Sequence, residues 1–161
     1  MSNTNYHLTI ESVRGEMKRE QKDHGIEVMT FEFGASVARD GASGQGKQRR
    51  QYTDVKFTKL VDRSSPTLQS MLATNSKIKT ATLVVAKAGG DNPLEYYKVI
   101  LSDAYIASYK IRGADFQDQW GAIPRDEFSI NFRKIEVTYV KQDQKGLPDG
   151  SVMFSDEINQ S

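Results

Sequence analysis

Residues 55–90, VKFTKLVDRSSPTLQSMLATNSKIKTATLVVAKAGG, predict a strand, one helix and a second strand in succession. Val55 and Phe57 alternate with polar residues, which is the period-two pattern of a half-buried strand. Residues 78–88 are again rich in apolar and β-branched side chains, as strands are. Because no other segment has a convincing helical pattern, the sequence predicts a mainly β protein that carries a single packed helix.

The predicted helix begins shortly after the first of these strands. Ser65 suits the N-cap, and Pro66 suits the first helical position, because proline has no N–H group to leave unpaired. Leu68, Met71 and Leu72 follow at i, i+3 and i+4, so they share one face of the helix. We expect all three to be buried, each contributing about 1.5–3 kcal/mol to folding.

Length and composition indicate one domain that spans residues 1–161, with 39–51 as an extended loop and 151–161 as a tail. The net charge of +1 creates no strong field toward nucleic acid or anionic lipid, so neither is an expected partner. Cysteine is absent, which excludes disulfides, thiolate metal sites and cysteine nucleophiles. The first residues show no secretion signal, and no stretch approaches transmembrane length.

Alternating apolar residues predict about eight strands joined by short antiparallel connections. Beside the two strands above, we expect strands at residues 7–13, 26–37, 95–102, 104–111 and 128–140. The alternation changes phase near Val28 and Met29 and again at Arg133 and Lys134, where bulges would bend the strands. These features predict a closed or nearly closed antiparallel β-barrel with one flanking α-helix.

The inward positions of the predicted strands carry enough large apolar side chains to fill a small barrel. They are Phe31, Phe33, Leu83, Val99, Phe128, Ile130 and Phe132, with Tyr97 and Leu101 facing the same way. The tail offers only Val152, Met153 and Phe154 as anchors. The loop at residues 112–125 contains Trp120, which is either a binding anchor or a plug over one end of the barrel.

The loop at residues 39–51, RDGASGQGKQRRQ, is long, polar and without an apolar anchor, which is uncommon unless a loop is functional. Its residues 41–47 match G-x-x-x-x-G-K, but Gln48 stands where a phosphate-binding loop needs serine or threonine, and a strand pattern follows. The basic residues Arg39, Lys47, Arg49 and Arg50 are interleaved with only one aromatic, Tyr52. We therefore expect a solvated loop or a contact with an acidic protein neighbour rather than a nucleotide or nucleic-acid site.

The sequence contains no convergent set of catalytic or metal-binding residues. His7 and His24 are the only histidines, and neither has the partner spacing of a metal ligand. Asp126 and Glu127 are adjacent, so they point to opposite faces of a strand, and no nucleophile elbow occurs. We therefore expect no enzyme activity, no metal and no cofactor.

Six segments, spread over most of the chain, resemble the Hcp (hemolysin-coregulated protein) family, the tube subunits of bacterial type VI secretion systems. In order they are IESVRGE, HGIEVMTFEFG, FTKLVDRSSPTLQSML, KAGG, LSDAYIASY and FSINFRKIEVTYVKQDQKG. Their order and spacing agree with the family, and the single predicted helix falls in the family's place. Two segments depart from it, because GADFQDQWGAIPRDEF lacks a glycine-rich run and SVMFSDEINQS lacks a tryptophan-containing close.

The resemblance implies a barrel similar to phage tail-tube proteins and a homo-hexameric ring with a wide channel. Rings of this kind stack into a tube inside a contractile sheath, capped by a spike protein, with small effector proteins in the lumen. The tube is assembled in the bacterial cytoplasm and then secreted without a signal peptide. The family's loop after the second strand contacts the adjacent ring, which implies a stacking role for Arg39, Asp40, Lys47, Arg49 and Arg50. Two alternatives stay open: a tail-tube subunit of another contractile particle, and a barrel that binds a small ligand.

Overall fold

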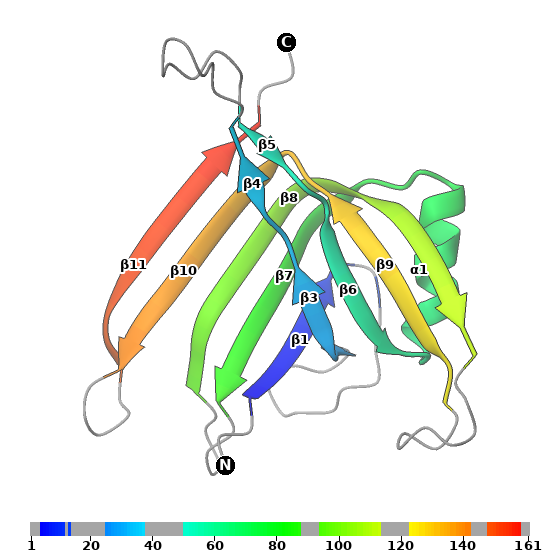
Figure 1. Ribbon diagram of the computed structural model, residues 1–161, viewed down its shortest axis with the longest axis horizontal. Helices are drawn as coiled ribbons and strands as arrows, with labels where there is room; N and C mark the ends of the chain where they lie inside the picture. The colour runs from blue at the N-terminus through cyan, green and yellow to red at the C-terminus, as the bar shows by residue number, and fades with distance from the viewer. Residues whose placement is uncertain are drawn as a thin grey trace.

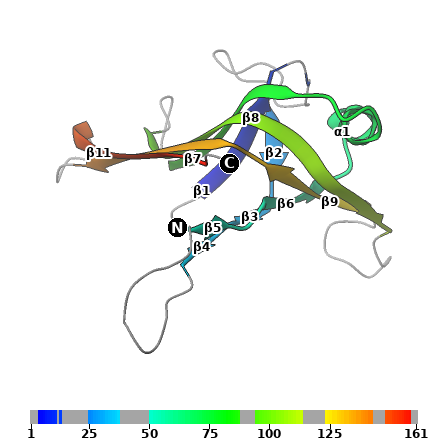
Figure 2. The ribbon, with the colours of Figure 1, turned by 90° about the horizontal axis from the view of Figure 1, so that it is seen from above.

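The protein is a strongly curved antiparallel sheet with one helix beside it (Figures 1 and 2). The computed structural model describes residues 4–11, 13, 25–37, 50–87, 94–113, 123–142 and 148–158. Its elements are β1 (Thr4–Ile10), β2 (Ile26–Val28), β3 (Thr30–Glu32), β4 (Ala35–Ser36), β5 (Gln51–Tyr52), β6 (Val55–Leu60), α1 (Ser64–Ala73), β7 (Ile78–Lys87), β8 (Leu94–Arg112), β9 (Arg125–Asn131), β10 (Lys134–Gln142) and β11 (Pro148–Glu157).

The main sheet has the strand order β2-β1-β7-β8-β9-β6-β3, with every neighbouring pair antiparallel. Its first and last strands are separated in sequence only by Met29, so the sheet curls until its two ends meet. The Met29 N–H group donates to the Thr58 carbonyl at 2.7 Å. Met29 lies between β2, which pairs with β1, and β3, which pairs with β6. The phase change near Val28 and Met29 therefore marks a change of partner strand rather than the predicted bulge within one strand. The antiparallel β-barrel with one helix is confirmed.

Strand β8 is one continuous element, so the prediction of two strands at residues 95–102 and 104–111 is wrong. Asp103 lies between those ranges with a φ of 50°, a left-handed conformation that aspartate tolerates better than most residues. The chain bends there instead of turning back. Before Asp103 the strand pairs with β10, and after it with β9, so the predicted corner at Arg133 and Lys134 lies opposite the bend.

The core lies between the curled layers of the sheet and is built from the inward positions of the strands. Leu83, Val99, Leu101, Phe128, Ile130 and Phe132 are all buried there, while Phe31, Phe33 and Tyr97 are half-buried and pack against them. The Phe57 and Phe128 rings stack with their centroids 5.2 Å apart, across the pairing of β6 with β9. The interior predicted from the alternation is thus confirmed.

Helix α1 begins at Ser64, and Arg63 stands at the N-cap position instead of the predicted Ser65. The Ser64 N–H group donates to Asp62 Oδ1 at 2.8 Å, whereas the Ser65 hydroxyl is turned toward the sheet. Leu68 is fully buried and Met71 half-buried, but Leu72 is 37% exposed, so its predicted burial is wrong. The helix packs through the narrow line that runs from Ser64 through Leu68 to Met71, and Leu72 lies at the border of that line.

The segment 151–161 does not form a tail held by apolar anchors, as predicted. Its residues as far as Glu157 belong to β11, which pairs with β10 along most of its length. Val152, Met153 and Phe154 are 69%, 70% and 45% exposed, so burial of these side chains does not hold the strand. Backbone hydrogen bonding to β10 does, and the two strands extend beyond the barrel (Figure 2).

Candidate functional site

The chain enters and leaves the long polar loop through the short ribbon formed by β4 and β5. Ala35 pairs with Tyr52, and Ser36 pairs with Gln51. Next to this ribbon, the Gly34 N–H group donates to Thr53 Oγ1 and the Thr53 N–H group donates to the Gly34 carbonyl, both at 2.9 Å. These bonds fix the position from which the loop leaves the barrel.

Arg50 is the only one of the predicted stacking residues that the structure describes, since Arg39, Asp40, Lys47 and Arg49 lie outside the described residues. Its Nε atom donates to Asp156 Oδ2 at 2.5 Å, and its Nη2 atom donates to Asp156 Oδ1 at 2.6 Å. Nη2 also donates to the Glu157 carbonyl at 2.8 Å. This two-pronged arrangement, which we call the Arg50 clamp, joins the base of the loop to the end of β11.

Tyr52 completes the Arg50 clamp and connects it to the core. Its hydroxyl donates to Asp156 Oδ2 at 2.6 Å. Its ring meets the buried Phe132 edge-on, with centroids 5.5 Å apart. Tyr52 therefore links the Arg50 clamp to the packed interior of the barrel.

The charges of the Arg50 clamp stabilise one another. The hydrogen bond from Arg50 is the main cause that lowers the pKa of Asp156 to about 2, and Tyr52 adds to it. The same bond raises the pKa of Arg50. Burial, followed by the bond to Asp156, raises the pKa of Tyr52. The ion pair consequently persists from mildly acidic to alkaline pH.

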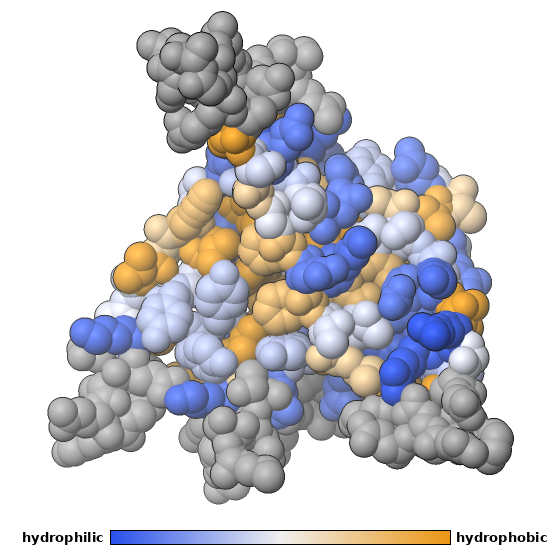
Figure 3. Space-filling model, viewed as in Figure 1, coloured by the Kyte–Doolittle hydropathy of each residue, from blue (hydrophilic) through white to orange (hydrophobic). Residues whose placement is uncertain are grey.

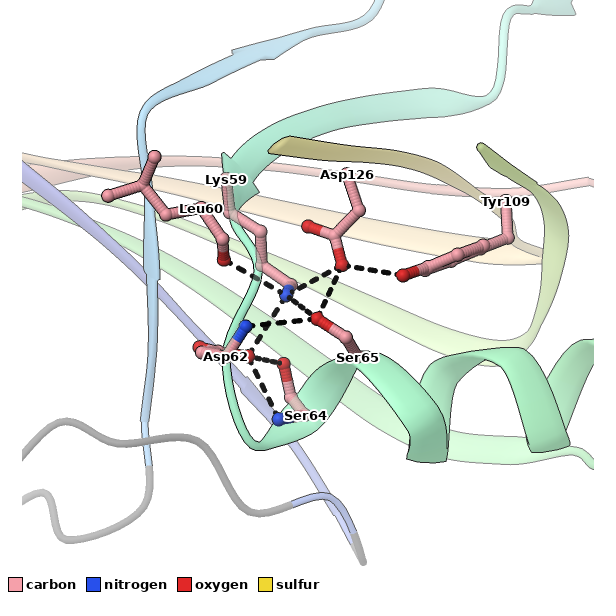
Figure 4. A network of polar contacts seen from close by, with 7 residues as sticks. All are labelled: Lys59, Leu60, Asp62, Ser64, Ser65, Tyr109 and Asp126. Carbon is pink, nitrogen blue, oxygen red and sulfur yellow. Dashed lines mark hydrogen bonds and ion pairs between the residues drawn. The ribbon is translucent and has the colours of Figure 1, made fainter. Parts of the chain in front are cut away.

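A second polar cluster lies where α1 meets the sheet and is centred on two fully buried charged residues (Figure 4). Lys59 and Asp126 both have side chains 0% exposed, and Lys59 Nζ donates to Asp126 Oδ2 at 2.9 Å. Nζ also donates to Asp62 Oδ1 at 3.0 Å and to Ser65 Oγ at 2.9 Å. Asp126 Oδ2 accepts two further bonds, from the Ser65 hydroxyl at 2.6 Å and from the Tyr109 hydroxyl at 2.8 Å.

This buried cluster joins β6, the start of α1, β8 and β9, and its role is structural. A serine hydroxyl beside a lysine amine is a pairing used for nucleophilic catalysis. Here Ser65 is only 4% exposed and its hydroxyl donates to Asp126, so a substrate does not reach it. The cluster instead anchors the helix to the barrel.

The buried cluster was not predicted from the sequence, although the strand alternation carried a signal for it. Lys59 has the same parity as the buried Val55 and Phe57, and Asp126 has the same parity as the buried Phe128. Both charged residues were therefore on inward positions of their strands. The expected divergence of Asp126 and Glu127 is confirmed, because the first is buried and the second exposed.

The remaining candidates from the sequence do not form a site within the described part of the chain. His7 lies on β1 and is 2% exposed, which agrees with a strand-face histidine. His24, Trp120 and the glycine-rich residues 41–47 lie outside the described residues. Among the residues that are described, no three histidine or acidic side chains gather as metal ligands would, and no helix is long and apolar enough to cross a membrane.

Comparison with known proteins gives consistent matches. Residues 7–139 match the family model described as "Type VI secretion system effector, Hcp". The chain is 30% identical over 97 residues to Protein hcp1 of Pseudomonas aeruginosa, an alignment that covers 60% of this chain and 57% of that protein. It is 27% identical over 134 residues to Major exported protein of the same organism, covering 80% of this chain and 78% of that protein.

The fold agrees with a solved structure from the same family. The crystal structure of Hcp1 from Salmonella typhimurium is 25% identical and superposes with a TM-score of 0.77, covering 98% of this chain and 95% of that one. The family model spans most of the chain, and the superposition covers nearly all of it. The chain therefore belongs to the Hcp family of type VI secretion system proteins.

Proposed function

We propose that six copies of this chain form a ring, and that the rings stack into the inner tube of a type VI secretion system. The observation that carries this proposal is the match of the Hcp family model to residues 7–139. A tube subunit needs a rigid body, and the barrel with its buried Lys59–Asp126 anchor supplies one. A ligand-binding role is less well supported, because large side chains such as Phe57 and Phe128 pack in the interior.

In this proposal the loop at residues 39–51 makes the contact with the next ring. Arg39, Asp40, Lys47 and Arg49 provide the polar contacts, since a loop on a rigid base can adapt to its neighbour. Arg50 has a different role from the one that the resemblance implied. Its guanidinium group is already bonded to Asp156 and Glu157 of its own chain, so it holds the base of the loop.

The proposed partners follow from the same assembly. They are the contractile sheath around the tube, the spike protein at its end, and small effector proteins inside the lumen. The tube is assembled in the bacterial cytoplasm and then expelled. Similarity to a protein named Major exported protein supports this export.

A deletion confined to the loop tests the stacking role. We replace residues 41–49 with a short glycine–serine linker and retain Arg50, so that the Arg50 clamp stays intact. In the bacterium of origin, the variant should form rings in lysates but fail to reach the culture medium. The matched control replaces the same residues with a glycine–serine segment of equal length, which separates loss of side chains from loss of length. Export of the deletion variant at the level of the unmodified protein would contradict the stacking role of the loop.

A further inference from the structure

The ribbon of β4 and β5 has little support of its own. It consists of two residue pairs and is separate from the nine-stranded sheet. An isolated two-stranded ribbon is at best marginally stable in water, so its position depends on contacts with the rest of the protein. Three of its four residues are exposed, and the fourth, Tyr52, packs its ring against the core.

The end of β11, by contrast, is attached to the barrel. Figure 3 shows apolar residues on the surface over β10 and β11, at the left of the view, and Val152 is one of those that are exposed. Ile158, the residue after β11, packs against the core, and its N–H group donates to the Arg133 carbonyl at 2.6 Å. The Arg133 N–H group in turn donates to the Ser102 carbonyl on β8 at 3.2 Å. The chain end that follows β11 is therefore joined to the turn between β9 and β10.

The Arg50 clamp connects the weakly supported ribbon to this attached end of β11. Arg50 lies just before β5 and Tyr52 ends it, and both donate to the carboxylate of Asp156. Because the guanidinium group binds Asp156 through two nitrogens and also reaches the Glu157 carbonyl, it fixes orientation as well as distance. Figure 1 shows β4, β5 and the end of β11 together at one end of the molecule.

We propose that the Arg50 clamp sets the position from which the loop at residues 39–51 meets the next ring, so that Asp156 and Tyr52 are positioning residues for ring stacking. The inference rests on the proposed stacking role of that loop and gives the end of the last strand a part in it. A contact costs less conformational entropy when the segment that makes it is already held in place, so a fixed loop base strengthens stacking.

Two substitutions break the Arg50 clamp from opposite sides. Asp156→Asn removes the carboxylate to which Arg50 and Tyr52 both donate. Arg50→Lys keeps the positive charge, but a single ammonium group cannot reproduce the forked guanidinium contact. If Arg50 served stacking only through its charge, as a contact with the next ring, Arg50→Lys would preserve stacking and Asp156→Asn would leave it unchanged.

Asp54→Asn is the matched control. It makes the same change of side chain and charge two residues after Tyr52. Asp54 accepts a hydrogen bond from Asn131 Nδ2 at 2.9 Å instead of binding Arg50. Asparagine retains an oxygen acceptor for that bond, so this variant alters the charge near the ribbon and leaves the Arg50 clamp intact.

Hydrogen exchange of backbone amides measures whether the clamp holds the ribbon. The sensitive amides are those of Gly34 and Thr53, which bond to one another's residues beside the ribbon. We expect Asp156→Asn and Arg50→Lys to reduce their protection while the amides of β7 stay protected, because a local contact is released and the barrel remains folded. Asp54→Asn should leave all of these amides unchanged. Unchanged protection of Gly34 and Thr53 in both clamp variants would overturn the inference.

Export from the bacterium of origin measures the consequence for stacking. We expect Asp156→Asn and Arg50→Lys to form rings in lysates with the mass of the unmodified rings but to be largely lost from the culture medium. Asp54→Asn should be exported at the level of the unmodified protein. Normal export of either clamp variant would overturn the inference, since the loop would then not need the clamp.

The outcomes separate this inference from the function on which it rests. If replacement of residues 41–49 by a short linker abolishes export and Asp156→Asn does not, the loop stacks without help from β11 and only the inference fails. If that replacement also leaves export unchanged, the stacking role of the loop fails as well.

Discussion

Lys59 and Asp126 are the two charged residues on which the helix–barrel junction depends most. Both side chains are 0% exposed, and they form an ion pair with an N–O distance of 2.9 Å. Removing one partner of a buried pair leaves an uncompensated charge in a low-dielectric interior, which costs about 3–5 kcal/mol. We expect Lys59→Met to lower the free energy of unfolding by about that amount, measured by urea denaturation at constant protein concentration.

The double variant Lys59→Met, Asp126→Asn is the control for this prediction. Asparagine keeps an acceptor for the hydroxyls of Ser65 and Tyr109 but carries no charge. We expect the double variant to be more stable than Lys59→Met alone, because the uncompensated charge is gone. Equal stability of the two variants would show that the charge of Asp126 is not what the lysine neutralises.

Asp156 makes the stability of the protein depend on pH in the acid range. Its pKa falls from 3.8 to about 2 in the folded state, mainly through its hydrogen bond with Arg50. A carboxyl group with a lowered pKa stabilises the fold fully above the unfolded value of 3.8, and this stabilisation is lost as the pH falls toward about 2. We expect Asp156→Asn to flatten the decline of the urea midpoint over that interval.

Glu157→Gln is the matched comparison for Asp156→Asn. Glu157 meets Arg50 through its backbone carbonyl, which the substitution leaves in place. We expect this variant to keep the acid dependence of the unmodified protein. If Glu157→Gln flattens the pH profile as much as Asp156→Asn does, the ion pair with Arg50 is not its source.

For single residues, the sequence indicates which side chains face inward but not which residues they contact. Alternation placed Lys59 and Asp126 on inward faces, yet 67 residues separate them, and no local pattern indicates that they meet. Arg50 was assigned to a stacking surface with its basic neighbours, and its bond to Asp156 joins residues 106 positions apart. Such pairs arise only when strand order brings distant segments together.

In helix α1 the burial predicted for Leu72 differs from the structure, and measurements of stability distinguish the two. Leu68 is 0% exposed, whereas Leu72 is 37% exposed. We expect Leu68→Ala to cost about 2–5 kcal/mol, because it removes buried surface and leaves a cavity. Leu72→Ala should change the free energy of unfolding by about 1 kcal/mol or less at the same dilute protein concentration. A cost for Leu72→Ala as large as that for Leu68→Ala would contradict the packing of α1 described here.

The other elements show which local signals are dependable. The phase change at Val28 and Met29 correctly indicated an irregularity, because side-chain parity is fixed by strand geometry. The chain changes partner strand there instead of forming the predicted bulge. Asp103 lies between two predicted strands, but the structure shows that it bends one strand that pairs on both sides of it. Strand β11 was not predicted, because its apolar residues do not alternate and backbone pairing with β10 holds most of its length.

At the scale of the whole molecule, the fold is that of a barrel from which two strands extend with their core face uncovered. The barrel and its single helix followed from alternation in the sequence. The extension did not, because the apolar residues of β11 do not alternate.

The central claim is that this chain assembles into a hexameric ring, and electron microscopy of the purified protein combined with light scattering tests it most directly. The account predicts six-fold particles with an open centre and a mass six times that of the 18.1 kDa chain. A homogeneous particle with the mass of a single chain at high protein concentration would contradict it.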